Sequence, residues 1–271
     1  MVDIFDKSLD GLKDKKLWLF DMDGTIYSED SLFDGTLELL DKITAHGGKY
    51  IFITNNSSKS VYDYVEKVTK MGIKADKDSF FTSSQATILM LKEKHEGAKV
   101  YCQGTKSLIR ELQEAGITIT EEVEPDIDVI LIGFDTELTS QKLRNTCENL
   151  LKDVPYYATN PDLVCPVSFG YVPDCGSVAI MLENATGKKP IFIGKPEPTM
   201  INIARKNLGY SKEETVVIGD RLYTDIASGV NAEVDTICVL SGEATLDDVN
   251  NSPVKPQYVI NSVKDLAKEL F

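Results

Sequence analysis

Two aspartates, Asp21 and Asp23, follow a short apolar run, Leu17–Phe20, and precede Gly24. Such a run is typical of a strand that is buried on both faces. Ligands of open α/β sheets bind outside the carboxyl ends of the strands, where Asp21 would lie. Two carboxylates this close repel each other, so the pair requires a cation or positive side chains nearby. Because an Asp-Gly pair alone is ordinary turn chemistry, the interpretation depends on the rest of the chain.

Three further polar groups occur later in the chain, and two of them also end apolar runs. They are Thr54 with Asn55 after Tyr50–Ile53, Lys195 between Gly194 and Pro196, and Asp220 with Asp225 after Thr215–Gly219. A parallel sheet gathers the carboxyl ends of its strands at one edge, which would bring these residues to Asp21. Taken singly, each has a simpler interpretation: a loop or helix cap, a solvated lysine, or a residue at a helix start. Their occurrence together favours a site.

Strand-like and helix-like segments alternate on both sides of these residues. Apolar residues at helical spacing occupy Gly35–His46 and Lys59–Met71, and a glycine follows each segment. Strand, helix, strand, helix is the pattern of a parallel sheet covered on both faces. The sequence therefore predicts an α/β fold, a doubly wound parallel sheet.

The pattern changes from about Ser84. Residues 84–189 contain their own alternation of helices and strands, and prolines and glycines punctuate Pro155–Gly176, which we expect to be a long, loop-rich stretch. This segment is large enough to form an α/β module inserted into the first. The predicted organisation is a core of residues 1–83 and 190–271 with an inserted cap of residues 84–189.

Composition excludes several classes of function. The net charge of -14 argues against nucleic acid as a partner, because the field of the protein would repel a phosphate backbone. No apolar run approaches membrane-spanning length, and the first residues lack the apolar core of a secretory signal, so we expect no membrane association and a cytoplasmic location. The sequence is compatible with a homo-oligomer and does not decide it.

Cysteine and histidine usage restricts the chemistry further. The five cysteines are scattered without a C-x-x-C pair, which is typical of neither a disulfide framework nor a zinc site. Only His46 and His95 are present, each near a predicted helix end. Histidine-based triads and histidine-rich metal sites are therefore nearly excluded. Any metal must be held by oxygen, as Mg²⁺ prefers.

Taken in order, the four polar groups resemble the haloacid dehalogenase (HAD) superfamily of phosphotransferases. The resemblance lies in D-x-D-G-T at Asp21–Thr25, T-N-N at Thr54–Asn56, G-K-P at Gly194–Pro196 and G-D-R-x-x-T-D at Gly219–Asp225. The chain is similar in particular to the NagD and nitrophenylphosphatase branch, because it also has Tyr27, a serine after T-N-N, and Pro198. That branch carries an α/β cap between the second motif and the lysine. The resemblance covers nearly the whole chain and implies a Rossmann-like core.

The resemblance implies a role for each motif. Asp21 would be the nucleophile that forms an aspartyl-phosphate, and Asp23 the general acid and then the general base. Mg²⁺ would take oxygens from Asp21, the Asp23 carbonyl and Asp220, with Asp225 holding a coordinated water or supporting the site. Thr54, Asn55 and Lys195 would hold the phosphoryl group.

Cap residues would select the leaving group in such an enzyme. Asn160 and Asp162 are candidate substrate contacts, although Asn-Pro-Asp is as often only a turn. Lys59 is more simply a solvated lysine at a helix start. Pro173–Gly176 departs from the P-G-x-G of the branch, which leaves the shape of that loop open.

The predicted activity is Mg²⁺-dependent hydrolysis of small phosphorylated metabolites. Nucleoside monophosphates or sugar phosphates are the expected substrates, with p-nitrophenyl phosphate as a surrogate. Alternatives are a phosphomutase or phosphotransferase of the same superfamily, a dehalogenase, which would need neither Asp23 nor a metal, and a non-catalytic phosphate-binding module. The sequence does not name the physiological substrate or the extent of cap movement.

Overall fold

The computed structural model describes residues 2–167 and 169–270, which form two compact units. The first unit comprises Met1–Thr54, Val61–Phe81 and Lys195–Phe271, and the second comprises Asn55–Ser60 and Thr82–Gly194. The short segment Asn55–Ser60, which carries most of the T-N-N-S motif, thus groups with the inserted unit.

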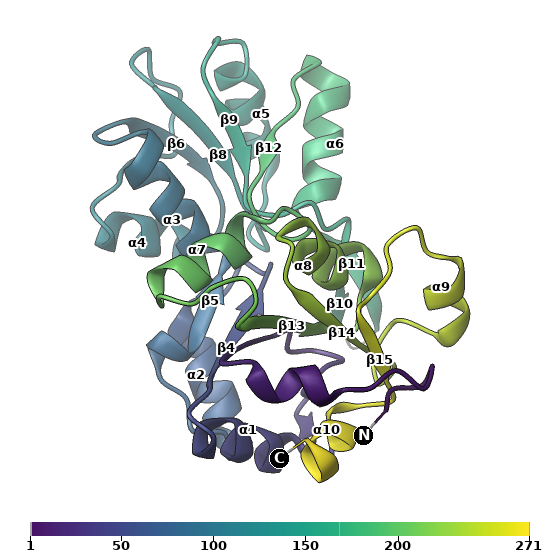
Figure 1. Ribbon diagram of the computed structural model, residues 1–271. Helices are drawn as coiled ribbons and strands as arrows, with labels where there is room; N and C mark the ends of the chain where they lie inside the picture. The colour runs from purple at the N-terminus through teal and green to yellow at the C-terminus, as the bar shows by residue number, and fades with distance from the viewer. Residues whose placement is uncertain (1, 168, 271) are drawn as a thin grey trace. The chain divides into compact units, whose positions relative to one another are not determined.

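A six-stranded sheet in the order β15-β14-β13-β1-β4-β5 forms the centre of the first unit (Figure 1). Its strands are β1 (Leu17–Phe20), β4 (Lys49–Thr54), β5 (Phe80–Thr82), β13 (Thr215–Gly219), β14 (Asp235–Val239) and β15 (Tyr258–Ile260). Pairing is parallel from β15 through to β4, and β1 lies between β13 and β4. All four residues of β1 are fully buried, which explains its unbroken apolar sequence.

Helices cover both faces of this sheet. They are α1 (Thr36–Ala45), α2 (Val61–Lys70), α7 (Thr199–Asn207), α8 (Ala227–Asn231), α9 (Leu246–Asn251) and α10 (Val263–Glu269). The unit also contains two 3₁₀ turns, η1 (Asp10–Asp14) and η2 (Lys77–Ser79), and one π-helical turn, η3 (Leu222–Ile226). Strands β2 (Tyr27–Ser28) and β3 (Ser31–Leu32) form a small separate hairpin. Alternate strand residues such as Trp18 and Phe20 pack with α1, α2 and α10, and α1 and α10 lie side by side. The predicted doubly wound α/β core is confirmed.

The second unit has its own parallel sheet in the order β12-β9-β8-β6-β7. Its strands are β6 (Lys99–Gln103), β7 (Thr118–Thr120), β8 (Val129–Ile132), β9 (Tyr156–Ala158) and β12 (Ile191–Phe192), and its helices are α3 (Ser83–Lys94), α4 (Lys106–Glu114), α5 (Ser140–Asn149) and α6 (Cys175–Thr186). An antiparallel pair, β10 (Val164–Val167) and β11 (Gly170–Pro173), completes the unit.

The stretch Pro155–Gly176, expected to be rich in loops, also contains three short strands that were not predicted, β9, β10 and β11. β9 is buried but only three residues long, and β10 and β11 contain Pro166, Gly170 and Pro173, residue types that are uncommon within strands.

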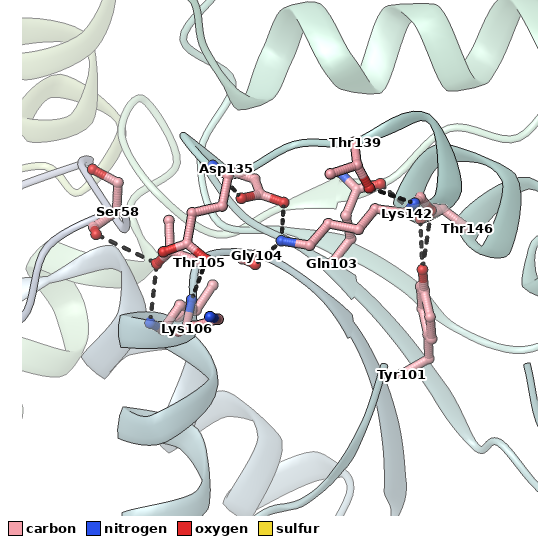
Figure 2. A network of polar contacts seen from close by, with 12 residues as sticks. Ser58, Tyr101, Gln103, Gly104, Thr105, Lys106, Asp135, Thr139, Lys142 and Thr146 are labelled. Atoms are coloured by element: carbon pink, nitrogen blue, oxygen red, sulfur yellow. Dashed lines mark hydrogen bonds and ion pairs between the residues drawn. The ribbon is translucent and has the colours of Figure 1, made fainter. Parts of the chain in front are cut away.

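A buried ion pair ties together the carboxyl ends of β6 and β8 in the second unit (Figure 2). Lys142 Nζ on α5 lies 2.9 Å from Asp135 Oδ2, whose side chain is fully buried, and donates to the Gly104 carbonyl at 2.8 Å. Asp135 Oδ1 accepts the Glu137 N–H. Within the described residues, no helix of either unit has the length and apolar character needed to span a bilayer.

Candidate active site

Three neighbouring strands of the first unit end in predicted site residues. Asp21 follows β1, Thr54 is the last residue of β4, and Asp220 follows β13. Since β13, β1 and β4 are parallel and adjacent, their carboxyl ends meet at one edge of the sheet. Thr54 and Asp220 are buried, and Asp21 is partly buried. The topology therefore gathers residues that are up to two hundred positions apart in the chain.

Lys195 links two of the acids at this edge. Its Nζ lies 2.6 Å from Asp21 Oδ1 and 2.5 Å from Asp225 Oδ1, and it also donates to the Ile53 carbonyl at 3.4 Å. The lysine is 3% exposed, so its charge is held in place by these partners rather than by water. Burial lowers the pKa of Lys195, but the charges of Asp21 and Asp225 raise it by more, so the net pKa lies above that of a free lysine. The side chain is therefore an ammonium throughout the physiological range.

Asp225 reaches the site because β13 ends in a glycine. Asp225 lies on η3, and a Cβ at Gly219 would lie 2.2 Å from the Asp225 Cβ, which no other residue type permits. The Arg221 N–H donates to Asp225 Oδ2 at 3.2 Å, while Oδ1 faces Lys195. The glycine and the π-helical turn thus place a buried carboxylate beside the lysine.

Oxygens of Asp21, Asp220 and Asp225 lie within 4.8 Å of one another. Three carboxylates and one ammonium leave two uncompensated negative charges, which one divalent cation balances. Asp220 Oδ2 accepts the Glu243 N–H at 2.8 Å, but the buried Asp220 Oδ1 has no hydrogen-bond partner among the described residues. A buried carboxylate oxygen without a partner is costly, so the site fits an oxygen-ligated cation.

The electrostatics show the same need for positive charge. Burial, reinforced by the neighbouring charge of Asp225, raises the pKa of Asp21 to about 8, although Lys195 opposes the shift. Burial and Asp225 likewise raise the pKa of Asp220 to about 6. With Lys195 and the nearby charge of Arg221 as the protein's own counter-charges, Asp21 and Asp220 are still protonated more readily than free carboxyls.

Asp23 has a different environment from Asp21. Asp23 is more exposed than Asp21 and begins the turn in which the Gly24 N–H donates to the Tyr27 carbonyl at 2.8 Å. Partial burial raises the pKa of Asp23, while the charges of Lys67 and Arg221 oppose the shift. Lys67 Nζ lies 4.0 Å from the centre of the Tyr27 ring, so α2 brings a cation to this turn.

The remaining predicted residues, Asn55, Asn160 and Asp162, lie in the second unit and contact one another. Asn55 Nδ2 donates to Asp162 Oδ2 at 2.6 Å, and Asn160 Nδ2 donates to the same oxygen at 2.8 Å. Asn160 also donates to Asp174 Oδ1 at 2.9 Å and has no exposed surface. The Asn160 side chain is thus enclosed in a hydrogen-bonded network, whereas Asp162 is partly exposed.

Some residues at the core site carried no recognisable signal in the sequence. Lys67 resembles any lysine on a helix surface. The segment Ser241–Ala244, which contacts Asp220, belongs to none of the four sequence motifs. Its one hint is its position, since it follows the apolar strand β14 at the same edge of the sheet.

Comparison with known proteins identifies the family. A model of haloacid dehalogenase-like hydrolases matches residues 18–118, and a HAD-hydrolase-like model matches residues 192–266. An acid sugar phosphatase from Staphylococcus aureus is 35% identical over 259 residues, which is 96% of this chain and 99% of the relative. The chain belongs to the haloacid dehalogenase-like hydrolase family.

Solved structures of this hydrolase family are similar over nearly the whole chain. A 4-nitrophenylphosphatase from Thermotoga maritima has a TM-score of 0.92 and 36% identity, covering 96% of this chain and 99% of its own. NagD from Escherichia coli K-12 has a TM-score of 0.85 and 32% identity, covering 93% and 98%. The predicted NagD and nitrophenylphosphatase branch of the HAD hydrolases is confirmed, and with it the Rossmann-like core.

Proposed function

We propose that this HAD hydrolase is a Mg²⁺-dependent phosphatase of small phosphomonoesters, with sugar phosphates as the favoured class. The observation that carries the proposal is the cluster of Asp21, Asp220 and Asp225 around Lys195, which includes a buried Asp220 oxygen without a protein partner. Carboxylate oxygens alone suit a hard divalent cation. The name of the Staphylococcus aureus relative supports sugar phosphates over nucleoside monophosphates.

Oxygens of Asp21, Asp220 and Asp225, with the carbonyl of Asp23, would hold the cation. When bound, Mg²⁺ supplies positive charge that offsets the repulsion between an anionic nucleophile and an anionic phosphate ester. The same charge would keep Asp21 ionised at neutral pH, against the burial that raises its pKa. Lys195 contributes a second, fixed positive charge at Asp21.

Asp21 is the proposed nucleophile. A carboxylate oxygen of Asp21 attacks the phosphorus, a P–O bond to Asp21 forms, and the P–O bond to the leaving group breaks. The product of this step is an aspartyl-phosphate. The Asp21 oxygen that faces Lys195 is held in position by the 2.6 Å contact, so the nucleophile is oriented before substrate arrives.

Asp23 is the proposed proton carrier. In its protonated form it donates a proton to the leaving oxygen, and as a carboxylate it then accepts a proton from the water that attacks the phosphorus. The P–O bond to Asp21 breaks in this second step and inorganic phosphate is released. Partial exposure and a raised pKa suit a group that must exchange protons with water and substrate.

The phosphoryl oxygens would be held by the Thr54 hydroxyl and the Asn55 N–H, which are adjacent in the chain, together with Lys195. Asp162 accepts from the Asn55 side chain, so we assign Asp162 and Asn160 to holding this segment. Asp162, which is partly exposed, remains the better candidate for a contact with the leaving group.

A panel of sugar phosphates, nucleoside monophosphates and p-nitrophenyl phosphate tests the proposal. Phosphate release is measured with Mg²⁺ and with a chelator, in water and with an added sugar as acceptor. Mg²⁺-dependent release to water, highest for sugar phosphates, is expected. No release from any substrate would overturn the proposal, and transfer to the acceptor sugar would replace it with a phosphotransferase.

A further inference from the structure

The segment Ser241–Ala244, here called the 241–244 loop, contacts both loops that carry catalytic-site acids in the first unit. Ser241 Oγ donates to the Gly24 carbonyl at 2.8 Å. The Glu243 N–H donates to Asp220 Oδ2 at 2.8 Å, and the Ala244 N–H donates to the Asp220 carbonyl at 3.0 Å. The loop is therefore hydrogen-bonded to the turn after β1 and to the residue after β13.

Two glycines approach the Asp220 carboxylate closely. A Cβ at Gly242 would lie 2.1 Å from Asp220 Oδ2 and 2.5 Å from Cγ, and a Cβ at Gly24 would lie 2.4 Å from Oδ2. Real Cβ atoms essentially never come closer than 3.0 Å, so any larger residue at Gly242 forces Asp220 or the 241–244 loop itself to shift. Gly24 also has a φ of +85°, whereas Gly242 is not among the glycines with positive φ. The glycine at position 242 is therefore required by the close approach of Asp220 and not by the backbone conformation.

The close approach and the Glu243 hydrogen bond together fix the direction of the carboxylate. Oδ2 is enclosed by the two glycines and bonded to a backbone N–H, which leaves Oδ1 as the oxygen available to a cation. That oxygen is buried and has no hydrogen-bond partner among the described residues. The side chain of Glu243 adds a further tie, since its Oε2 lies 2.9 Å from Arg221 Nε, next to Asp220 in the chain.

We infer that the 241–244 loop is a positioning element that aims Asp220 Oδ1 at the metal, with Gly242 and Ser241 as its decisive residues. The inference rests on the proposed function, because it assigns the loop to the cation of that site. Groups that orient a metal ligand through hydrogen bonds typically change metal affinity by about tenfold to a hundredfold when altered. Substitutions in the 241–244 loop should therefore weaken metal binding even in variants that still fold.

Calorimetric titration with Mn²⁺, without substrate, tests the inference. The variants are Gly242→Ala, which forces Asp220 and the 241–244 loop apart, and Ser241→Ala, which removes the bond to Gly24. Gly11→Ala is the matched control, because an added Cβ there would meet only Tyr258 Oη at an ordinary 3.6 Å and Gly11 has no positive φ. Thermal unfolding of each metal-free variant monitors folding.

Gly242→Ala is expected to weaken Mn²⁺ binding by about tenfold or more, Ser241→Ala by a smaller factor, and Gly11→Ala not at all. If Gly242→Ala does not fold, Ser241→Ala alone decides. Wild-type Mn²⁺ affinity in the folded variants would overturn the inference and leave the proposed function standing. Failure of the wild-type protein to bind Mn²⁺ would overturn both.

Discussion

Asp21→Asn is predicted to stabilise the metal-free protein at alkaline pH while removing its activity. Asp21 has a pKa of about 8 in the folded chain against 3.8 for a free side chain, with burial as the main cause. The folded state therefore binds the proton more tightly than the unfolded state. Stability is fully present below about pH 4 and falls as the pH rises towards 8. Asparagine stays neutral and escapes this loss.

A pKa of about 8 against 3.8 corresponds to a ceiling on the order of 6 kcal/mol, at about 1.4 kcal/mol for each tenfold change in proton affinity. Relaxation and water penetration reduce such penalties, so we expect Asp21→Asn to raise the free energy of unfolding by about 2 kcal/mol at pH 8.5. At pH 4.5 the two proteins should differ little. Lys195 keeps its second partner, Asp225, in the variant.

Denaturant unfolding at pH 4.5 and 8.5, in the presence of a chelator, measures the effect. Asp153→Asn is the control, because that side chain is fully exposed and its replacement should give the same difference at both pH values. Saturating Mg²⁺ should reverse the order of stability, since the cation binds the wild-type carboxylate. If Asp21→Asn is no more stable than wild type at pH 8.5 with chelator, the electrostatic account of the cluster is refuted.

Three further predictions concern single side chains. Asp23→Asn should cost more on substrates with poor leaving groups than on p-nitrophenyl phosphate, because only the former need a proton at the leaving oxygen; equal losses in kcat would contradict the general-acid role. Lys142→Met should destabilise the fold by about 3–5 kcal/mol in denaturant titrations, since it leaves Asp135 buried without its partner; an unchanged midpoint would disprove this. Asp162→Ala should lower kcat/KM by about tenfold, with partial recovery in Asp162→Asn, because the Asn55 side chain loses a charged acceptor; unaltered kinetics would remove the positioning role.

The core elements could be predicted because burial on both faces leaves a plain signature. The apolar run Thr215–Gly219 forms β13 with the same bounds, and the helix-like segment Gly35–His46 forms α1, Thr36–Ala45. In both cases the local sequence contains the whole signal, an apolar run or a helical spacing of apolar residues.

The supports of the site could not be predicted because they join residues far apart in the chain. Glu243 meets Asp220 across 23 residues, and Asn55 meets Asp162 across 107. A backbone N–H donor has no sequence signature, and the glycine at position 242 shows its role only once Asp220 is placed against it. The sequence motifs predicted which carboxylates form the site, whereas the orientation of these carboxylates follows from the tertiary structure.

Labelling of the enzyme during turnover tests the central claim most directly. A phosphomonoester with a radiolabelled phosphoryl group is mixed with enzyme and Mg²⁺, the reaction is quenched in acid, and labelled peptides are mapped. We predict a hydroxylamine-sensitive label on Asp21 that requires Mg²⁺ and is missing from Asp21→Asn. Turnover without any labelled protein, or with the label on another residue, would contradict the assignment of Asp21 as the nucleophile.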